Sequence, residues 1–151
     1  MVELSEVCLK QCKRNCCEAI PYGYLSKADL DRFHKHGWEP KVFKLTETLY
    51  TDLELQDCPF FINNRCTIYP DRPFACRTYP IDFTVIISEG KVFLDPFIYP
   101  DKDCPITKLI SLDDKELILK DVKICVQGLK EQGNEDLEYY LLSKNEVIRI
   151  S

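Results

Sequence analysis

The sequence predicts a small α+β domain, and three observations lead to that prediction. The chain has 151 residues, which is about the length of one domain and enough to enclose one hydrophobic core. Hydrophobic residues make up 45% of it, as is usual for a globular chain, and without repeats or linkers we treat residues 1–151 as a single domain. Predicted helices occupy both ends and predicted strands the middle, an order that favours α+β over an alternating α/β fold.

Two helices are predicted before the first strand. Residues 4–20 are rich in helix formers and end before a proline. A shorter helix is predicted over 26–37, where Ser26 and Asp29 stand three apart as a capping box. Gly37 suits the position just after the last turn, because glycine readily adopts the left-handed conformation that ends many helices.

The middle of the chain carries strand patterns. Apolar and polar residues alternate over 41–50, which predicts one strand, and residues 52–56 are expected to continue its pairing. Residues 57–80 are rich in proline, cysteine and aromatic residues, and they predict short strands, turns and one helical turn. Residues 83–95 have the pattern of a β-hairpin, with Gly90 in its turn.

The C-terminal part, residues 111–142, is predicted to be helical. Its first helix begins with a capping box of Ser111 and Asp114, and its apolar residues recur at near-helical spacing. A second short helix is predicted over 134–142. Residues 96–106 contain three prolines and are expected to form a loop between the hairpin and this part.

Composition excludes two classes of function. The net charge is −5, so the basic surplus that a nucleic-acid-binding surface needs is missing. No run of 18 apolar residues occurs, so no membrane span is expected, and the N-terminus lacks the pattern of a signal peptide. We therefore expect a cytoplasmic protein. In that reducing compartment, clustered cysteines bind metals or carry out redox chemistry more often than they form structural disulfides.

Nine cysteines carry the main functional signal. Cys125 falls on the apolar face of a predicted helix and is expected to pack as a small hydrophobic residue. The other eight form an N-terminal cluster and a second group in or near loops, and we expect both groups to ligate metal. The eight candidate ligands are Cys8, Cys12, Cys16, Cys17, Cys58, Cys66, Cys76 and Cys104. The alternative is that they form structural disulfides or remain buried thiols.

Helix geometry argues against one zinc ion held by the N-terminal cluster alone. On a helix, Cys8, Cys12 and Cys16 would share one face. Cys8 and Cys16 would lie about 12 Å apart at a rise of about 1.5 Å per residue, whereas sulfurs around one zinc lie roughly 3.8 Å apart. Three arrangements remain: the helix unwinds near Cys16, two metals divide the cysteines, or an iron–sulfur cluster uses part of the row. The adjacent Cys16 and Cys17 would point in different directions, which favours two sites or an unwound turn.

The second group of cysteines lies among turn-forming residues. Prolines and asparagines between Cys58 and Cys76 fold the chain back, so cysteines far apart in sequence can converge on one centre. Arg72 and Arg77 flank these cysteines, and we predict that they stabilise thiolates or bind an anionic cofactor. The alternative is that both arginines form surface salt bridges.

The segment CTIYPDRPFACRTYP, with a cysteine eight positions before its first residue and the cluster upstream, resembles the CxxCxxCC (YkgJ-like) cysteine-cluster family. The resemblance covers residues 8–106 and implies a zinc- or iron-chelating metal-binding core, with Cys104 at the family's final cysteine. Flagellin lysine-N-methylases carry a related domain that is associated with an iron–sulfur cluster. The first cluster is spaced C-x3-C-x3-CC here, where the family has C-x2-C-x2-CC.

Three functions fit these observations. The first is a metal-binding protein that carries an iron–sulfur cluster, with 4Fe-4S favoured over zinc, in a redox or accessory role. The second is an enzyme or enzyme subunit that uses the cluster to modify a protein or small molecule, by methyl transfer as the resemblance implies. The third is a structural zinc module that binds a protein partner. The sequence shows no acid–base pair, so whether the protein is an enzyme stays open.

Overall fold

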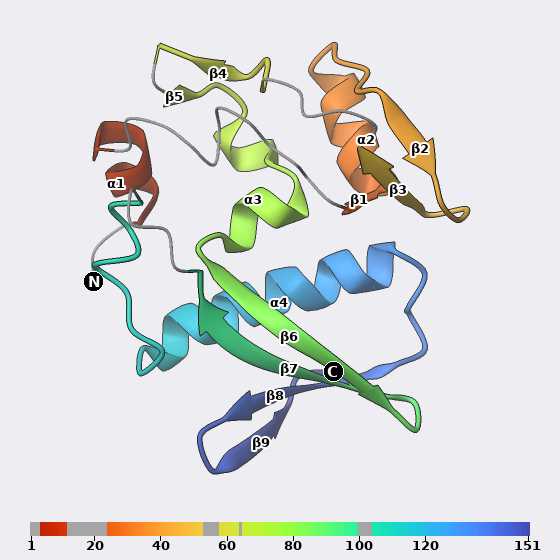
Figure 1. The fold of residues 1–151 in the computed structure, drawn as a ribbon, viewed down its shortest axis with the longest axis vertical. Coiled ribbons are helices and arrows are strands. Elements are labelled where there is room, and N and C mark those ends of the chain that lie inside the picture. Colours follow the sequence, from red (N-terminus) through yellow and green to blue (C-terminus); the bar gives the residue numbers. More distant parts are fainter. Residues whose placement is uncertain (1–3, 12–23, 53–57, 64, 100–103) are drawn as a thin grey trace.

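The computed structural model describes residues 4–11, 24–52, 58–63, 65–99 and 104–151, and it shows a mixed α+β single-domain fold (Figure 1). The predicted fold class is confirmed. The helices are α1 (Leu4–Gln11), α2 (Lys27–Lys35), the 3-10 turn η1 (Tyr69–Asp71), α3 (Phe74–Thr78) and α4 (Lys115–Glu131). The strands are β1 (Tyr24–Ser26), β2 (Val42–Lys44), β3 (Leu49–Asp52), β4 (Phe61–Ile62), β5 (Arg65–Cys66), β6 (Ile81–Ser88), β7 (Lys91–Ile98), β8 (Glu138–Ser143) and β9 (Glu146–Arg149). No helix among these residues is long and apolar enough to cross a membrane.

A four-stranded sheet in the order β6-β7-β8-β9 forms the lower half of the molecule in Figure 1. The hairpin β6–β7 is antiparallel, and both turn residues, Glu89 and Gly90, have positive φ, as a tight two-residue turn requires. Strand β8 pairs parallel to β7, and α4 makes the crossover between them. Strand β9 closes the sheet as an antiparallel partner of β8. We call α4 with β6–β9 the sheet half.

The main hydrophobic core lies between α4 and one face of this sheet. Alternate strand residues point into it, as the two-residue period of a strand dictates. Helix α4 contributes residues at intervals of three and four, which form one apolar stripe. The buried members are Ile81, Phe83, Val92, Leu94, Ile118, Val122, Cys125, Val126, Tyr139 and Leu141.

The remaining described residues, 4–80 and 104–110, form what we call the cysteine half. It contains a three-stranded sheet in the order β1-β3-β2, the short hairpin β4–β5 and the helices α1 to α3. Its larger hydrophobic cluster is small and centres on α2; its buried members are Leu25, Leu30, Phe33, Phe60 and Ile68. Several elements here are only two to five residues long, so neighbouring segments must hold them in place.

Two side chains join the halves through α3. One Asp29 carboxylate oxygen accepts from the Ser26 N–H while the Ser26 hydroxyl oxygen accepts from the Asp29 N–H, which forms the predicted capping box of α2. The other carboxylate oxygen accepts from Arg32 at 2.6 Å and from the Phe74 N–H, so Asp29 also holds the start of α3. The ring of Phe74 packs on Gly128 of α4, so closely that an added Cβ would lie 2.6 Å from it.

Two sequence predictions of secondary structure are wrong. Residues 41–50 form parts of two paired strands, β2 and β3, because a turn at Thr46 reverses the chain and its hydroxyl accepts the Leu49 N–H. The helix predicted over 134–142 is instead mostly strand β8. Its good helix formers are outweighed by pairing with β7, which buries alternate residues such as Tyr139.

Two boundaries also differ from the prediction. Helix α4 is capped by Asp114, whose carboxylate accepts the Leu117 N–H, while Ser111 makes only a preceding turn. Strand β7 runs through Pro96 into the predicted loop. Proline is tolerated there because β8 pairs with β7 only as far as Leu94. The hairpin over 83–95 and the α2 capping box are confirmed, whereas residues 12–20 and 53–56 lie outside the described residues.

Candidate metal centre

Helix α1 brings Cys8 to the neighbourhood of two other candidate ligands. The helix packs against β5, which contains Cys66. Cys8 also packs against the small buried cluster of Val7, Cys104 and Ile106. Three cysteines that are far apart in the sequence therefore lie in one region. Figure 1 shows α1 on its left, beside the segment that begins at residue 104.

The hairpin β4–β5 and helix α3 bring together a second set. Cys58 lies just before β4, and its carbonyl accepts a hydrogen bond from the Phe61 N–H. Phe61 in turn pairs with Cys66 across the hairpin. Cys76 lies in α3. All three cysteines, Cys58, Cys66 and Cys76, pack against the hydrophobic cluster around α2. Cys66 belongs to both sets, so the two sets adjoin.

Tyr69 marks the place where the sets meet. Burial raises the pKa of its hydroxyl, Arg72 opposes the rise, and charge on Cys8 and on Cys66 adds to it. This hydroxyl therefore lies within electrostatic range of a cysteine from each side. In the sequence, Tyr69 is one of several aromatic residues in the segment 57–80, and its position between Cys66 and Cys76 was the available signal.

The described side chains do not close a metal site by themselves. Among them, no three His, Cys, Asp or Glu side chains are grouped closely enough to hold an ion. Three of the eight candidate ligands, Cys12, Cys16 and Cys17, lie outside the described residues. Five cysteines from five segments nevertheless lie in two adjoining clusters, and thiolate donors fit zinc or an iron–sulfur cluster.

Arg72 is held beside this region by Tyr69. Its Nε donates to the Tyr69 carbonyl at 2.8 Å, and its guanidinium carbon lies 3.5 Å from the centre of the Tyr69 ring. Stacking of this kind fixes a guanidinium while leaving other N–H groups available. Arg72 is thus positioned by Tyr69, whose hydroxyl lies within electrostatic range of Cys8 and Cys66.

Arg77 of the cysteine half has buried nitrogen atoms in its guanidinium group. Its Nε and Nη2 atoms are buried and have no hydrogen-bond partner among the described residues. Burial lowers the pKa of its guanidinium, Arg32 and Arg72 lower it further, and Asp29 and Glu131 act in the opposite direction. Buried N–H groups of a cation are costly to leave without partners, so Arg77 supplies donors that a negatively charged centre could use.

A buried ionic network supports the surroundings of Arg77. Arg32 contacts Asp29 at 2.6 Å and Glu131 of α4 at 3.3 Å. Glu131 also accepts from the Ser26 hydroxyl at 3.3 Å. The sequence identified Ser26 and Asp29 only as a local cap, because no pattern along the chain shows that Glu131 reaches them.

Two groups of α4 lie apart from the candidate ligands. Cys125 is 4% exposed within the main core, as predicted, and burial raises the pKa of its thiol to about 12. Such a thiol is a poor thiolate ligand.

Asp121 is buried nearby, and burial raises the pKa of its carboxyl to about 7, against opposing effects of Lys120 and Arg72. Sequence analysis missed Asp121, although its spacing from Ile118 and Cys125 places it on the buried face.

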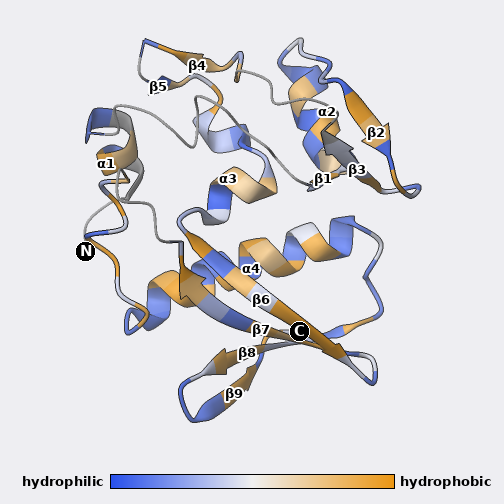
Figure 2. Ribbon diagram, in the orientation of Figure 1, coloured by the Kyte–Doolittle hydropathy of each residue, from blue (hydrophilic) through white to orange (hydrophobic). Residues whose placement is uncertain are grey.

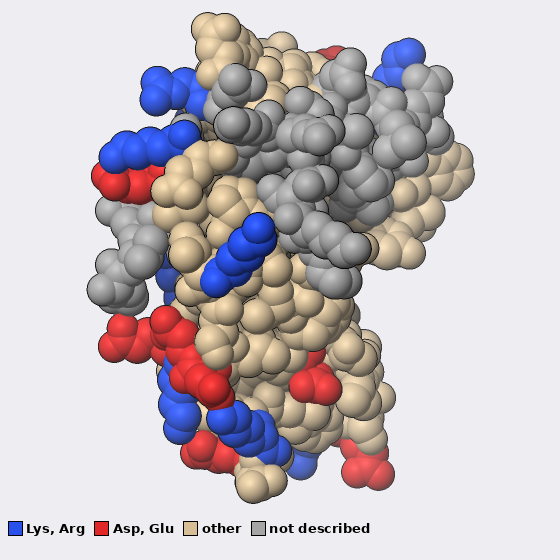
Figure 3. All heavy atoms as spheres, turned by 60° about the vertical axis from the view of Figure 1, so that its left-hand side comes forward, with Lys and Arg blue, Asp and Glu red and all other residues tan. Residues whose placement is uncertain are grey.

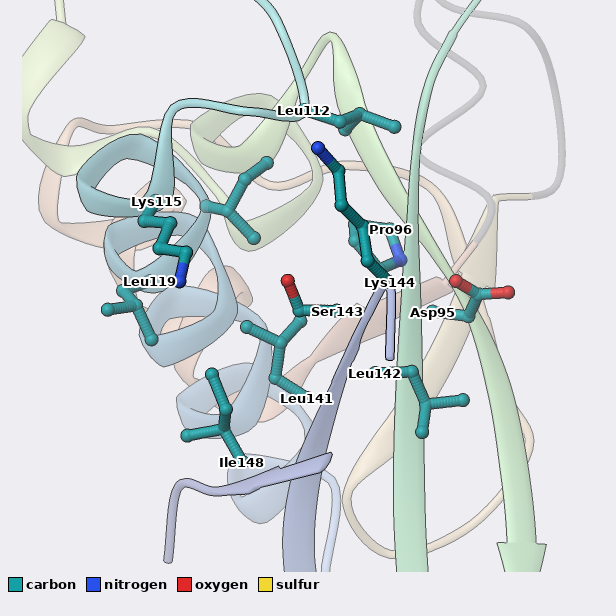
Figure 4. Close-up of a pocket in the computed structure, with 11 residues that line it drawn as sticks. Asp95, Pro96, Leu112, Lys115, Leu119, Leu141, Leu142, Ser143, Lys144 and Ile148 are labelled. Carbon is teal, nitrogen blue, oxygen red and sulfur yellow. The ribbon is translucent and has the colours of Figure 1, made fainter. Parts of the chain in front are cut away.

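The hollow drawn in Figure 4 lies away from all these cysteines, between the start of α4 and strands β7 to β9. It encloses about 210 Å³ and is lined mainly by aliphatic side chains. Its two lysines are already paired, Lys144 with Asp113 and Lys115 with Glu146. We therefore do not assign it a role at the metal centre.

Charge on the face that carries α1 is mixed. Figure 3 shows basic and acidic side chains of described residues interspersed over its lower part, with no single basic patch among them.

Comparison with known families gives one match. The model of the CxxCxxCC family, described as a candidate zinc- or iron-chelating domain, matches residues 7–105. The matched region begins beside Cys8 and ends just after Cys104, so it spans every cysteine except Cys125. No curated protein and no solved structure gives a significant match.

Proposed function

Because the chain belongs to the CxxCxxCC family, whose members are grouped as zinc- or iron-chelating domains, we propose that it carries an iron–sulfur cluster, of the 4Fe-4S type, in a redox or accessory role in the cytoplasm. The observation that supports this most is the convergence of Cys8, Cys66 and Cys104 with Cys58 and Cys76 in adjoining clusters. Thiolates from separate segments suit a cluster that holds its ligands further apart than one ion does.

The remaining ligands would come from the N-terminal segment. Cys12, Cys16 and Cys17 follow α1, which positions Cys8 next to β5. We propose that all eight cysteines serve this centre or a pair of centres, and that the metal-binding core is residues 8–106. When bound, an iron–sulfur cluster supplies one-electron chemistry. The chain would contribute thiolate ligands and an apolar shell that limits access of water.

Arg72 and Arg77 would tune the centre without ligating it. A thiolate-rich centre is negatively charged, and nearby guanidinium groups stabilise such charge. Arg77 is the stronger candidate because two of its nitrogen atoms are buried without partners among the described residues. Hydrogen bonds to cluster sulfur raise a reduction potential, so we expect Arg77→Gln to lower it at unchanged iron content. Arg65→Gln is the control, since Arg65 is exposed.

The experiment that tests the proposal is anaerobic purification followed by counting of iron, zinc and acid-labile sulfide. We expect a brown protein with equal amounts of iron and sulfide. A colourless protein that contains zinc and no sulfide would show that the metal is structural zinc and not an iron–sulfur cluster. A protein-binding zinc module would then be the better-supported function. A further check compares two variants: Cys76→Ser should lose metal, and Cys125→Ser should retain it.

A further inference from the structure

The two outer strands of the main sheet differ in how well they are protected. Strand β9 has four residues and carries Glu146 and Arg149 at its ends. Strand β6 has eight residues, and from Phe83 to Ser88 it contains no charge, no proline and no glycine. Natural sheets usually guard such edges with charge, proline or short length, because an unguarded edge pairs with another strand. From Phe83 to Ser88 the β6 edge lacks these protections, and Asp82 is the one charged residue of the strand.

Strand β6 also exposes apolar side chains on both of its faces. Val85, Ile86 and Ile87 are 42%, 47% and 64% exposed. Figure 2 shows the half of β6 next to the hairpin turn as hydrophobic. Val85 shares the core-facing side of the sheet with Phe83, which is only 7% exposed, so burial decreases steadily toward the turn. Three consecutive exposed β-branched residues on an open edge form an interaction surface.

The hairpin register shows which backbone groups point outward. In a two-residue hairpin, the residues that flank the turn bond to each other and bonded pairs then alternate. Ser88, Ile86 and Thr84 therefore bond toward β7, and the N–H and C=O groups of Phe83, Val85 and Ile87 are directed to the outer edge. The Phe83 N–H donates there to the Asp82 carboxylate at 2.8 Å. Pro96 stands opposite Phe83, at a position of β7 that needs no N–H toward β6, which agrees with this assignment.

We propose that β6 pairs antiparallel with β6 of a second copy of this chain, with Val85 opposite its own counterpart. Phe83 then lies opposite Ile87 of the partner subunit. The Phe83 N–H exchanges the Asp82 carboxylate for a backbone carbonyl of the partner strand, and the outward backbone groups of Val85 and Ile87 gain partners. The four strands of each copy join into one continuous sheet. Val85 and Ile87, which α4 leaves exposed, become covered by the same residues of the second copy.

Charge favours this occupant and this direction. Asp82 lies near one end of β6, and Lys91, the hairpin partner of Ser88, lies at the other end on the same face of the sheet. Antiparallel pairing centred on Val85 places Asp82 opposite Ser88 of the partner subunit, next to the partner's Lys91. Two-fold symmetry produces this opposite-charge pair twice. A parallel copy would instead place like charges near each other.

The test compares substitutions at matching positions of the two edges. Val85→Pro removes an outward N–H of β6 and keeps every bond to β7. Val147→Pro does the same on β9, because Val147 also lies between bonded pairs of a two-residue hairpin. Molecular mass of the metal-loaded full chain is measured by light scattering over a wide range of concentrations. We expect a dimer for the wild type and for Val147→Pro, and a monomer for Val85→Pro.

A second pair of variants tests the same edge without proline, because a proline substitution can also disturb the fold of the strand. Ile87→Lys places charge on the exposed edge without restricting the backbone, and Val147→Lys is its control, with 58% exposure. Hydrogen exchange should show the Val85 and Ile87 amides protected in the dimer, with protection lost on dilution. A wild-type monomer at all concentrations, or a dimer that both β6 variants retain, overturns the proposal, whatever metal the protein contains.

Discussion

The sheet half and the cysteine half differ in what holds them together. The sheet half has ten buried core residues between a 17-residue helix and four strands. Among its described residues, the cysteine half has two separate clusters of five and three buried residues, under elements as short as two residues. A small core gives little stability by itself, and proteins with small cores add disulfides or metals. The comparison teaches that bound metal should matter structurally in one half and hardly at all in the other.

Removal of metal should therefore have the largest effect, and it should be confined to one half. Because metal binding and folding are coupled when the ligands come from separate segments, we expect chelation to unfold the cysteine half and leave α4 with β6–β9 folded. Hydrogen exchange of the two halves measures this directly. Unfolding of both halves together, or of neither, would contradict the division.

Asp29→Ala should have the next largest effect. The change removes the side-chain half of the α2 capping box and the acceptor of the Phe74 N–H at the start of α3, and it leaves Arg32 without its closest partner. Breaking a buried ion pair on one side costs about 3–5 kcal/mol, and the loss should be accompanied by weaker metal retention because α3 carries Cys76. Urea unfolding measures the first effect and metal analysis the second. Asp31→Ala, at an exposed position of the same helix, is the control and should change neither.

Asp121→Asn should stabilise the sheet half relative to the wild type, and this stabilising effect should increase with pH. The folded-state pKa of Asp121, about 7, lies above its ordinary value of 3.8. Burial of this carboxyl therefore favours folding only while it is protonated, and that contribution is lost as the pH rises from 3.8 through 7. Relative to the wild type, the Asn variant should gain about 2–4 kcal/mol between about pH 4 and about pH 8. A constant difference across this range would contradict the assignment.

Gly128→Ala should have the smallest effect and should test the contact between the halves. An added Cβ meets the Phe74 ring at 2.6 Å, and overpacking of this kind costs about 1–3 kcal/mol. Alanine also favours the helix by about 1 kcal/mol, so a modest net loss is expected. In a Phe74→Ala background, the same substitution should become stabilising. Thermal unfolding of the four proteins completes the cycle; equal effects of Gly128→Ala in both backgrounds would show that Phe74 does not constrain this position.

The sequence predicted the elements that local chemistry determines. The capping box of α2 needs only Ser26 and Asp29, and the β6–β7 hairpin needs only alternation and a glycine in the turn. Strand β8 was missed because its residues are also good helix formers and its pairing partner, β7, lies more than 40 residues earlier, beyond α4. Local preference gives way to such pairing whenever it buries residues as large as Tyr139.

The candidate site was predictable as a set of cysteines but not as an arrangement. Spacing separated Cys125 from the other eight, and the core position of Cys125 confirms its predicted packing role. That Cys8 would meet Cys66 and Cys104 could not be read from the chain, because it depends on how α1 packs against β5 and the segment after β7. The Arg77 nitrogen atoms, which have no hydrogen-bond partner among the described residues, likewise depend on tertiary burial, although the place of Arg77 next to Cys76 had marked it as a candidate.

The central claim is that cysteines from both sets bind one kind of centre, and X-ray absorption at the metal edge of the purified protein tests it most directly. The account predicts iron with sulfur neighbours only, at about 2.3 Å, and a second shell of iron. A first shell dominated by nitrogen or oxygen would contradict it.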